Sequence, residues 1–445
     1  MPSPPSCSWS RREQRRHTTR MARCPAGRSS RAGRSSRAGR SGRSSMSSEA
    51  WAVTGAGGCP EAPPEGLQGL RGLAVSVVGA ARSGVAAANL LVRAKASVCL
   101  SDTKREAELA EHLSHVDPRV RLVTGRNDLG HRDLVVVSPG IPPAAAIWKE
   151  IAATGAPVWG EMELGFRAAR APLVAITGTD GKTTTTSLVG AIFAAAGWPH
   201  LVLGNIGRPL CDGVDTVPPE GVLVVEVSCF QLLHVVSFRP RVAVLLNLAE
   251  DHLDYHPSFA HYVAAKLRIF ERQGPGDTAV LSHDDPGVCR HATRLPAGVR
   301  RWTFSGKQAA SPGVGLQDGL LLDLTGGEPR VLLARSASPL QGEHNGENLA
   351  AAAAAGLAMG LEPQVIARGL SGFRSLPHRL EQVRLLDGVS WVNDSKATSP
   401  HAALAGLRAV AGPVVLLAGG VDKGLDLGEW AEEIQRCCHH VVLTG

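Results

Sequence analysis

The stretch 171–189, APLVAITGTDGKTTTTSLV, decides how the rest of the chain is interpreted. Its run Leu173 to Ile176 is apolar and follows a proline, which is typical of a buried parallel strand. The turn 178–183, GTDGKT, comes next and leads into a helix-compatible segment that extends to Phe193. A strand, a glycine-containing turn and a helix N-terminus bring several backbone N–H groups to one point, where the helix dipole adds positive potential. This order of elements predicts a site for nucleotide phosphates.

The turn carries two chemically suitable side chains and departs from the usual pattern at one position. Lys182 supplies a positive charge, and Thr183 supplies a hydroxyl suited to Mg²⁺. The common phosphate-binding loop has a further glycine five positions before its Gly-Lys pair, and Ile176 stands there in this chain. The alternative is a glycine-rich turn with a solvated lysine. The strand before the turn and the helix after it favour the phosphate site.

Length and charge indicate a chain of two or three domains with a basic extension. The net charge of +7 over 445 residues is concentrated in residues 1–50, which hold twelve arginines and two glutamates. The remainder is slightly acidic, so we expect no nucleic-acid binding by the folded part. The segment 27–45 has no apolar residue larger than alanine, and we expect residues 1–65 to be a disordered extension without a secretory signal. Met21 and Met46 are alternative start positions.

Cysteine spacing and hydropathy exclude several other classes of protein. The nine cysteines show no Cys-x-x-Cys pair and no regular spacing, so we expect neither a zinc nor a disulfide framework. A reducing cytoplasm fits this pattern. No apolar run approaches the ~18–20 residues that a membrane-spanning helix needs, so we expect no membrane association.

Three strand-like runs near the start of the ordered chain end in polar turns. The run 73–78 is followed by GAARSG, in which Ala81 stands where a dinucleotide-binding turn has its middle glycine. The run 97–100 leads to Asp102 and Thr103, and the run 134–137 leads to Ser138. Because open α/β sheets bind ligands at the carboxyl ends of their strands, this edge is a candidate ligand site. Ordinary βα-loop chemistry remains an equally good interpretation of this region.

The middle of the chain adds acidic groups after apolar strands. A strand within 221–227 delivers Glu226, which could be a Mg²⁺ partner beside a phosphate site. A strand over 242–248 leads to the segment 250–254, EDHLD, which is either a solvated loop or a metal and phosphate site. The segment 262–270 predicts an amphipathic helix. On its own, Lys266 in that helix would be a solvated charge.

The last part of the chain predicts a second doubly wound unit from about residue 376. Asn345 and Asn348 have an i, i+3 spacing at the start of an Ala-rich helix over 349–358. Strands over 389–392 and 414–418, and a third near 441, follow the proline-containing junction LPHRLE. The first two end in lysines at positions where anionic ligands would be met.

Taken together, these stretches resemble the Mur ligases, the ATP-dependent amide-forming family of peptidoglycan synthesis. The resemblance covers roughly residues 70–445 and is carried by motifs in this order: GTDGKTT, GNIG (204–207), EVSCFQL, EDHLDYH, AAKLRIF, GEHNGEN, LPHRLE and NDSKAT. The shortened phosphate-binding turn is the form that this family uses. NDSKATS and SPGI favour the member that joins D-glutamate to UDP-N-acetylmuramoyl-L-alanine through an acyl phosphate.

The resemblance implies an α/β fold of three domains. These would be a Rossmann-like UDP-binding domain at 66–165, a P-loop ATPase domain at 166–375 and an incomplete Rossmann-like domain at 376–445. In the family the last domain continues further, so we expect a truncated chain that ligates poorly. The alternatives are another Mur-type ligase, a relative of folylpolyglutamate synthase, or a non-catalytic binder of nucleotides or UDP-sugars.

The resemblance also implies roles for individual residues in a monomeric, cytoplasmic enzyme that uses ATP and two Mg²⁺ ions. The UDP-substrate would be bound by Arg82, Ser83, Asp102, Thr103, Ser138, Gly140 and Asn205. ATP would be bound by Gly178, Thr179, Asp180, Gly181, Lys182, Thr183, Thr184, Asn348, Arg379 and Asp394. D-Glutamate would be met by Lys396, Thr398 and Lys423. The catalytic residues would be Lys182, Glu226, His252 and Lys266, and the metal ligands would be Thr183, Glu226, His252 and an N-carbamylated Lys266.

Overall fold

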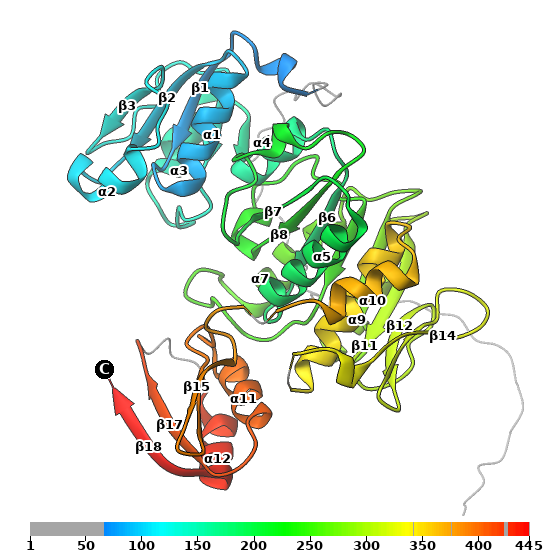
Figure 1. Cartoon of the computed structure of the whole chain (residues 1–445). Helices are drawn as coiled ribbons and strands as arrows, with labels where there is room; N and C mark the ends of the chain where they lie inside the picture. The colour runs from blue at the N-terminus through cyan, green and yellow to red at the C-terminus, as the bar shows by residue number, and fades with distance from the viewer. Residues whose placement is uncertain (1–65, 341, 375, 422–425, 445) are drawn as a thin grey trace, which may run out of the picture. The chain divides into compact units, whose positions relative to one another are not determined.

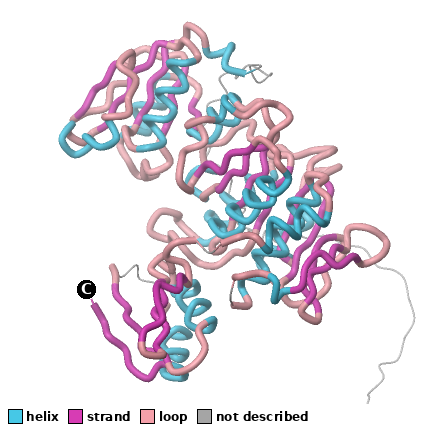
Figure 2. The backbone as a smooth tube through the Cα atoms, viewed as in Figure 1, coloured by secondary structure: helices cyan, strands magenta, loops and turns pink. Residues whose placement is uncertain are grey.

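The computed structural model describes residues 66–340, 342–374, 376–421 and 426–444. The expected disordered extension over residues 1–65 and the candidate residue Lys423 lie outside this described part. The architecture is α/β, with two sheets built on parallel strands and four further strands near the C-terminus (Figures 1 and 2). The α/β fold class that the sequence predicts is therefore confirmed.

The first sheet has five parallel strands in the order β3-β2-β1-β4-β5. Its central strands are apolar because nearly all of their side chains are buried. The strands are β1 (Ala74–Val78), β2 (Ser97–Asp102), β3 (Arg121–Thr124), β4 (Leu134–Val137) and β5 (Val158–Gly160), and the helices among them are α1 (Arg82–Arg93), α2 (Glu106–Leu113) and α3 (Ile147–Thr154).

The second sheet has nine strands in the order β14-β13-β12-β11-β10-β9-β6-β8-β7, with only β13 and β14 antiparallel to their neighbours. The strands are β6 (Leu173–Thr177), β7 (His200–Gly204), β8 (Val222–Glu226), β9 (Val242–Leu245), β10 (Thr278–Ser282), β11 (Arg300–Ser305), β12 (Gly313–Gln317), β13 (Leu320–Asp323) and β14 (Arg330–Ala334). The helices are α4 (Glu161–Ala168), α5 (Lys182–Ala196), α6 (Cys229–Leu232), α7 (Phe259–Leu267), α8 (Pro286–His291), α9 (His344–Ala358) and α10 (Pro363–Ser371).

Small residues allow three helices of the second sheet to pack closely. The run Ala350 to Ala355 of α9 is fully buried, and α9 contacts α5 and strand β11. Gly369 of α10 lies against α5, because a Cβ added there would be 2.6 Å from the Cα of Ile192. The abundance of alanine in this region therefore has a packing reason, since larger side chains would separate these elements.

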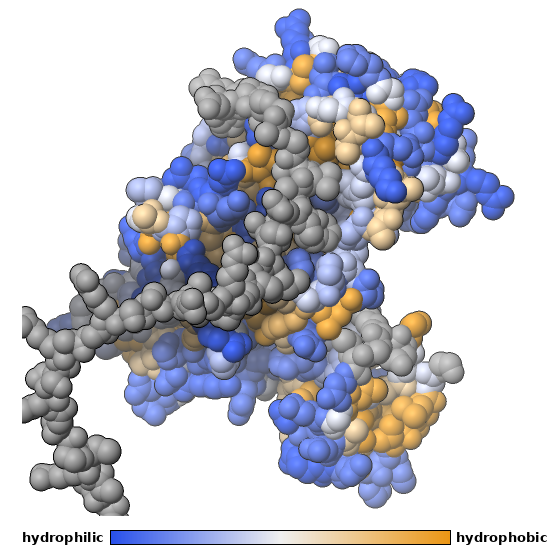
Figure 3. Space-filling view, turned by 180° about the vertical axis from the view of Figure 1, so that it is seen from behind, coloured by the Kyte–Doolittle hydropathy of each residue, from blue (hydrophilic) through white to orange (hydrophobic). Residues whose placement is uncertain are grey.

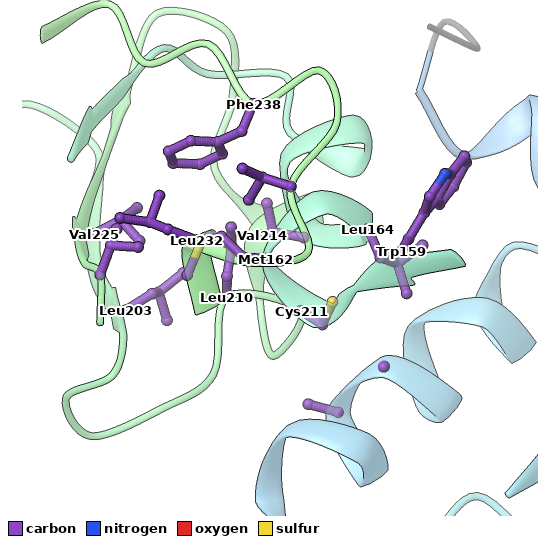
Figure 4. Packing of buried hydrophobic residues seen from close by; sticks show 14 of the residues in the cluster. Trp159, Met162, Leu164, Leu203, Leu210, Cys211, Val214, Val225, Leu232 and Phe238 are labelled. Atoms are coloured by element: carbon purple, nitrogen blue, oxygen red, sulfur yellow. The ribbon is translucent and has the colours of Figure 1, made fainter. Parts of the chain in front are cut away.

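A second apolar cluster packs helix α4 against the strands of the second sheet. Met162 and Leu164 of α4 are fully buried, and Figure 4 shows them among apolar side chains from several loops and strands. Neighbouring members of the cluster are Leu203, Leu210, Val225, Leu232 and Phe238. The core thus continues from the sheet into the segment that precedes β6.

The C-terminal strands correct one expectation from the sequence. We expected about three strands in a doubly wound unit, but the structure has four: β15 (Glu381–Leu386), β16 (Val389–Asn393), β17 (Val414–Gly419) and β18 (Cys438–Thr444). β15 and β16 form an antiparallel hairpin, whereas β17 and β18 are a parallel pair. Asp387 and Gly388 both have positive φ angles at the hairpin turn, as a two-residue Asp-Gly turn requires. Helices α11 (Pro400–Ala409) and α12 (Gly428–Cys437) complete this region.

The described residues contain neither a helix suited to crossing a membrane nor a disulfide. None of the helices within those ranges combines the length and the apolar composition that crossing a membrane demands. The six cysteines that the structure describes, at positions 99, 211, 229, 289, 437 and 438, are all free thiols.

Candidate active site

The turn between β6 and α5 places backbone N–H groups at the carboxyl edge of the second sheet. Residues 178–183, called the phosphate loop from here on, connect the two elements. Gly181 has a φ of 79°, and a Cβ there would lie 2.4 Å from the Asn348 Oδ1, so only glycine fits this position without strain. Helix α5 has no side-chain N-cap, and its first N–H groups have no acceptor within the helix. This is the geometry that anion-binding helix termini use.

Two lysines converge on one carbonyl of the phosphate loop. The Lys182 Nζ donates to the Gly178 carbonyl at 2.9 Å and to the Thr179 carbonyl at 2.6 Å. The Lys266 Nζ, from helix α7, donates to the same Gly178 carbonyl at 2.6 Å. Two lysine amines therefore lie together at the phosphate loop, beside the N-terminus of α5.

Lys266 is buried, contrary to the interpretation of its helix taken alone. Only 1% of the residue is exposed, and its Nζ lies 4.6 Å from the centre of the Tyr262 ring. Burial, with the neighbouring Lys182 charge as a second cause, lowers the pKa of Lys266 to about 7. A substantial fraction of this amine is therefore neutral, and nucleophilic, near neutral pH.

Glu226 ends strand β8 beside the phosphate loop and has one carboxylate oxygen without a partner. The residue is 2% exposed, and its Oε1 accepts a hydrogen bond from the Asn205 Nδ2 at 2.9 Å. Its Oε2 is buried and has no hydrogen-bond partner in the structure. A buried, unsatisfied carboxylate oxygen is costly unless a cation or another donor meets it.

His252 lies in the loop after β9 in an unusual backbone conformation. Its φ is 55°, which is uncommon for a residue with a side chain. Its Nε2 is 3.3 Å from the Asp251 Oδ2, and its ring packs 4.7 Å from the Phe230 ring. Across the described ranges no three His, Cys, Asp or Glu side chains form a ready-made metal cluster.

Asn348 lies behind the phosphate loop and is buried. The Asn348 Oδ1 accepts a hydrogen bond from the Thr185 Oγ1 at 3.0 Å, and its Nδ2 donates to the Asn345 Oδ1 at 2.9 Å. Both polar ends of this side chain thus have protein partners, and the bond from Thr185 ties α9 to α5. Its role at the adenosine of ATP stays a prediction.

The structure adds residues around the phosphate loop that the sequence did not indicate. Asn247 follows β9 and hydrogen-bonds to the loop backbone, and Tyr262 places its hydroxyl 2.9 Å from the Thr179 Oγ1. The place of Asn247 near the end of the apolar run 242–248 was the available signal, because the carboxyl ends of parallel strands meet ligands at the edge of a sheet. Nothing in the sequence marked Tyr262, whose place in the amphipathic pattern predicted only packing.

The candidate residues of the first sheet lie at the carboxyl ends of its strands. The Asp102 Oδ2 accepts from the Ala80 N at 2.8 Å and its Oδ1 accepts from the Lys104 N at 2.9 Å, so this carboxylate shapes the turn after β1. The Ser138 hydroxyl donates to the Gly79 carbonyl at 3.0 Å. The remaining members of this group are exposed or partly exposed: Arg82, Ser83, Thr103 and Gly140.

The candidate residues of the C-terminal region surround the loop after β16. The Asp394 Oδ1 accepts a hydrogen bond from the Leu380 N at 3.0 Å, and burial raises the pKa of Asp394. Lys396 and Thr398 are exposed, and Arg379 is half-buried. These positions are compatible with ligand binding, and their individual roles stay predictions.

Comparison with known proteins identifies the family. The Mur ligase middle domain matches residues 176–356, and the MurD-like N-terminal domain of Mur ligases matches residues 74–160. The UDP-N-acetylmuramoylalanine--D-glutamate ligase of Pelotomaculum thermopropionicum is 43% identical over 379 residues, which cover 83% of this chain and 82% of that protein. The chain belongs to the Mur ligase family. The protein of the same name from Desulfitobacterium hafniense (strain Y51) is 40% identical to this Mur ligase over 374 residues, 83% of this chain and 82% of that one.

A solved Mur ligase structure shares the fold. The crystal structure of UDP-N-acetylmuramate-alanine ligase from Thermotoga maritima has a TM-score of 0.54 to this chain at 17% identity, over 83% of this chain and 85% of the other. As a Mur ligase, the chain is an enzyme of the class that couples amide-bond formation to ATP.

Proposed function

We propose that this Mur ligase joins D-glutamate to UDP-N-acetylmuramoyl-L-alanine in the cytoplasm, using ATP and Mg²⁺, during peptidoglycan precursor synthesis. The named relatives support the choice of substrates. The observation that carries the chemistry is the convergence of Lys182 and Lys266 on the Gly178 carbonyl beside an uncapped helix N-terminus. Such an arrangement suits the negatively charged triphosphate of ATP.

The reaction proceeds in two displacements that balance without a redox step. The L-alanyl carboxylate attacks the γ-phosphorus of ATP, which forms an acyl phosphate and releases ADP. The D-glutamate amine then attacks the acyl carbon, and inorganic phosphate leaves as the amide forms. Lys182 exchanges its loop carbonyls for phosphate oxygens and neutralises charge in both steps, while the loop N–H groups hold the transferred group in line.

The residues around Glu226 fit a divalent cation. The unpartnered, buried Glu226 Oε2 is a hard oxygen donor of the kind Mg²⁺ prefers, and Thr183 and His252 would be further ligands from the protein. When bound, Mg²⁺ offsets negative charge on the phosphate oxygens.

Lys266 would take part as a carbamate. Its neutral amine attacks CO₂, a C–N bond forms, one proton leaves, and the side chain becomes an anion. This change removes the repulsion between two neighbouring cations and supplies a further oxygen donor for Mg²⁺. Carbon-13 NMR of protein equilibrated with labelled bicarbonate detects the carbamate, and Lys266→Met should remove the signal.

The outer residues would bind the two substrates. Arg82, Ser83, Asp102, Thr103, Ser138, Gly140 and Asn205 would contact the UDP-substrate, and Lys396, Thr398 and Lys423 would meet the carboxylates of D-glutamate. Arg379, Asp394 and Asn348 would hold the adenosine end of ATP.

Phosphate release in the presence of all three substrates tests this function. We expect release that depends on UDP-N-acetylmuramoyl-L-alanine and on D-glutamate, and not on L-glutamate. Lys182→Ala should lower turnover by ~10²–10³-fold, as loss of a charge-stabilising group does, while Lys149→Ala, at an exposed lysine of α3, should not. Equal rates with both glutamates, or normal turnover by Lys182→Ala, would contradict the proposal.

A further inference from the structure

We propose that Asn247 is a positioning residue that fixes the backbone of Thr179 and Asp180, so that the phosphate loop presents its remaining N–H groups to the phosphates of ATP. This inference rests on the proposed function, because it concerns how the same loop is shaped. Asn247 stands two residues after β9, beside β6 in the sheet. The two strands therefore deliver Asn247 and the phosphate loop to the same edge.

The Asn247 side chain makes three hydrogen bonds to the loop backbone. Its Oδ1 accepts from the Thr179 N at 2.9 Å and from the Asp180 N at 2.8 Å. Its Nδ2 donates to the Asp180 carbonyl at 3.3 Å. One amide thus satisfies two donors and one acceptor of the loop, which only an asparagine-like side chain of this length can do.

The Thr179 side chain ties the same two segments together a second time. The Ala249 N donates to the Thr179 Oγ1 at 3.0 Å, and the Thr179 hydroxyl is 3.2 Å from the Ala249 carbonyl. The segment 247–249 is therefore bonded to two consecutive residues of the phosphate loop. Gly178 adds close packing, because a Cβ there would lie 2.8 Å from the Leu246 Cβ.

These contacts divide the N–H groups of the loop into two sets. The Asp180 N–H is taken by the Asn247 side chain, and the Thr179 N–H is shared between that side chain and the Asn247 backbone carbonyl, which is 3.1 Å away. The N–H groups of Lys182, Thr183 and Thr184 are in the first turn of α5, where no intrahelical acceptor exists. Asn247 therefore holds the loop open in the shape that directs the second set at an anion, before any nucleotide arrives.

Binding measurements on the whole chain test the role of Asn247. Isothermal titration with Mg²⁺ and ATP should show that Asn247→Ala binds ATP at least about tenfold more weakly than the unchanged chain. The loss of a preorganising hydrogen-bond network predicts this reduction. Affinity for UDP-N-acetylmuramoyl-L-alanine should stay within about twofold, since that ligand does not depend on the loop. Asn89→Ala is the matched control, because Asn89 also braces a backbone segment, between His115 and Asp117 in the first sheet. It should leave ATP affinity unchanged.

Equal ATP affinity of Asn247→Ala and the unchanged chain would overturn the inference. If the unchanged chain itself fails to bind ATP, the proposed function fails, and the inference is then decided by hydrogen exchange. In the nucleotide-free chain, the amide of Asp180, whose acceptor is the Asn247 side chain, should already be protected from exchange, whereas the amides of Lys182 to Thr184 should not be. The same protection pattern decides the matter if Asn247→Ala does not fold. Fast exchange at Asp180 without nucleotide would overturn the inference.

Discussion

At the scale of single residues, the chemistry of the site depends on burial that the sequence does not display. Lys266 stands in an amphipathic helix, where an isolated lysine is most often solvated, and only the family resemblance indicated a role for it. The structure buries it against Tyr262 and the Gly178 carbonyl. Glu226 was easier to predict, because a carboxylate that ends a buried strand has few structural reasons to be there.

The lowered pKa of Lys266 makes a prediction about stability. Between pH about 7 and the ordinary lysine value of 10.5, the unfolded chain binds more protons at this position than the folded chain does. The contribution of this group to the free energy of unfolding therefore rises by roughly 1 kcal/mol per pH unit across that window. The contribution is lowest below the window. We expect the free energy of unfolding of the unchanged chain to rise more steeply than that of Lys266→Met.

Urea unfolding of both proteins at pH 7.5 and 8.5, in buffers free of CO₂, measures the difference. Removing CO₂ matters because carbamate formation would abolish the titration of the amine. Other titrating groups cancel, since they are common to both proteins. Parallel pH profiles would show that Lys266 is not destabilised as the cation.

At the scale of elements, the sequence predicted the strand–turn–helix unit of the phosphate loop with good bounds. Strand β6 begins at the expected Leu173 and ends one residue later than expected, and helix α5 extends three residues beyond Phe193 to Ala196. Long apolar runs and glycine punctuation are local signals, so they are readable without tertiary information. The run 242–248 was predicted too long, because the strand ends at Leu245 and the following residues turn toward the phosphate loop.

Several other elements were not predicted from the sequence. Strands β10 to β14 were not predicted, although together they form more than half of the second sheet. The hairpin of β15 and β16 was also missed, although the Asp387-Gly388 pair between two alternating runs is a strong hairpin signal. The proline in LPHRLE indicated a domain boundary there, so no strand was predicted directly after it.

The two ends of helix α5 offer a matched test of how the phosphate loop is packed. Gly181 and Gly197 both have positive φ angles, but only Gly181 has a neighbour, the Asn348 Oδ1, where a Cβ would go. Gly197→Ala should lower the free energy of unfolding by about 1 kcal/mol, because only the backbone conformation is disfavoured there. Gly181→Ala should lower the free energy of unfolding by about 2–4 kcal/mol in total, because it carries the same backbone penalty and must also displace Asn348. Denaturant unfolding of the two variants gives the comparison, and equal losses would show that the contact with Asn348 is unimportant.

At the scale of the whole molecule, the C-terminal strands expose apolar side chains. Leu385 is 66% exposed and Leu443 is 76% exposed, with Val383, Trp391 and Leu417 also accessible. Figure 3 shows apolar side chains gathered on the surface that these strands form. Strands with unpaired edges and exposed apolar residues favour association with other chains.

We expect this surface to promote self-association, although the family resemblance implied a monomer. The double variant Leu385→Lys, Leu443→Lys should shift the sedimentation profile at high protein concentration toward the smaller species. Val331→Lys is the control, because Val331 is 60% exposed on β14 and lies outside this group of strands. A profile that does not change in the double variant would show that the exposed strands do not associate.

The central claim is that the chain activates the L-alanyl carboxylate as an acyl phosphate at the loop of Lys182. The most direct test uses UDP-N-acetylmuramoyl-L-alanine with oxygen-18 at both positions of that carboxylate, together with ATP and D-glutamate, and mass spectrometry of the released phosphate. The account predicts one oxygen-18 atom per phosphate, because the attacking carboxylate oxygen leaves with the phosphorus. Lys182→Ala should release far less of it. Unlabelled phosphate, formed at the same rate as the amide, would contradict the account.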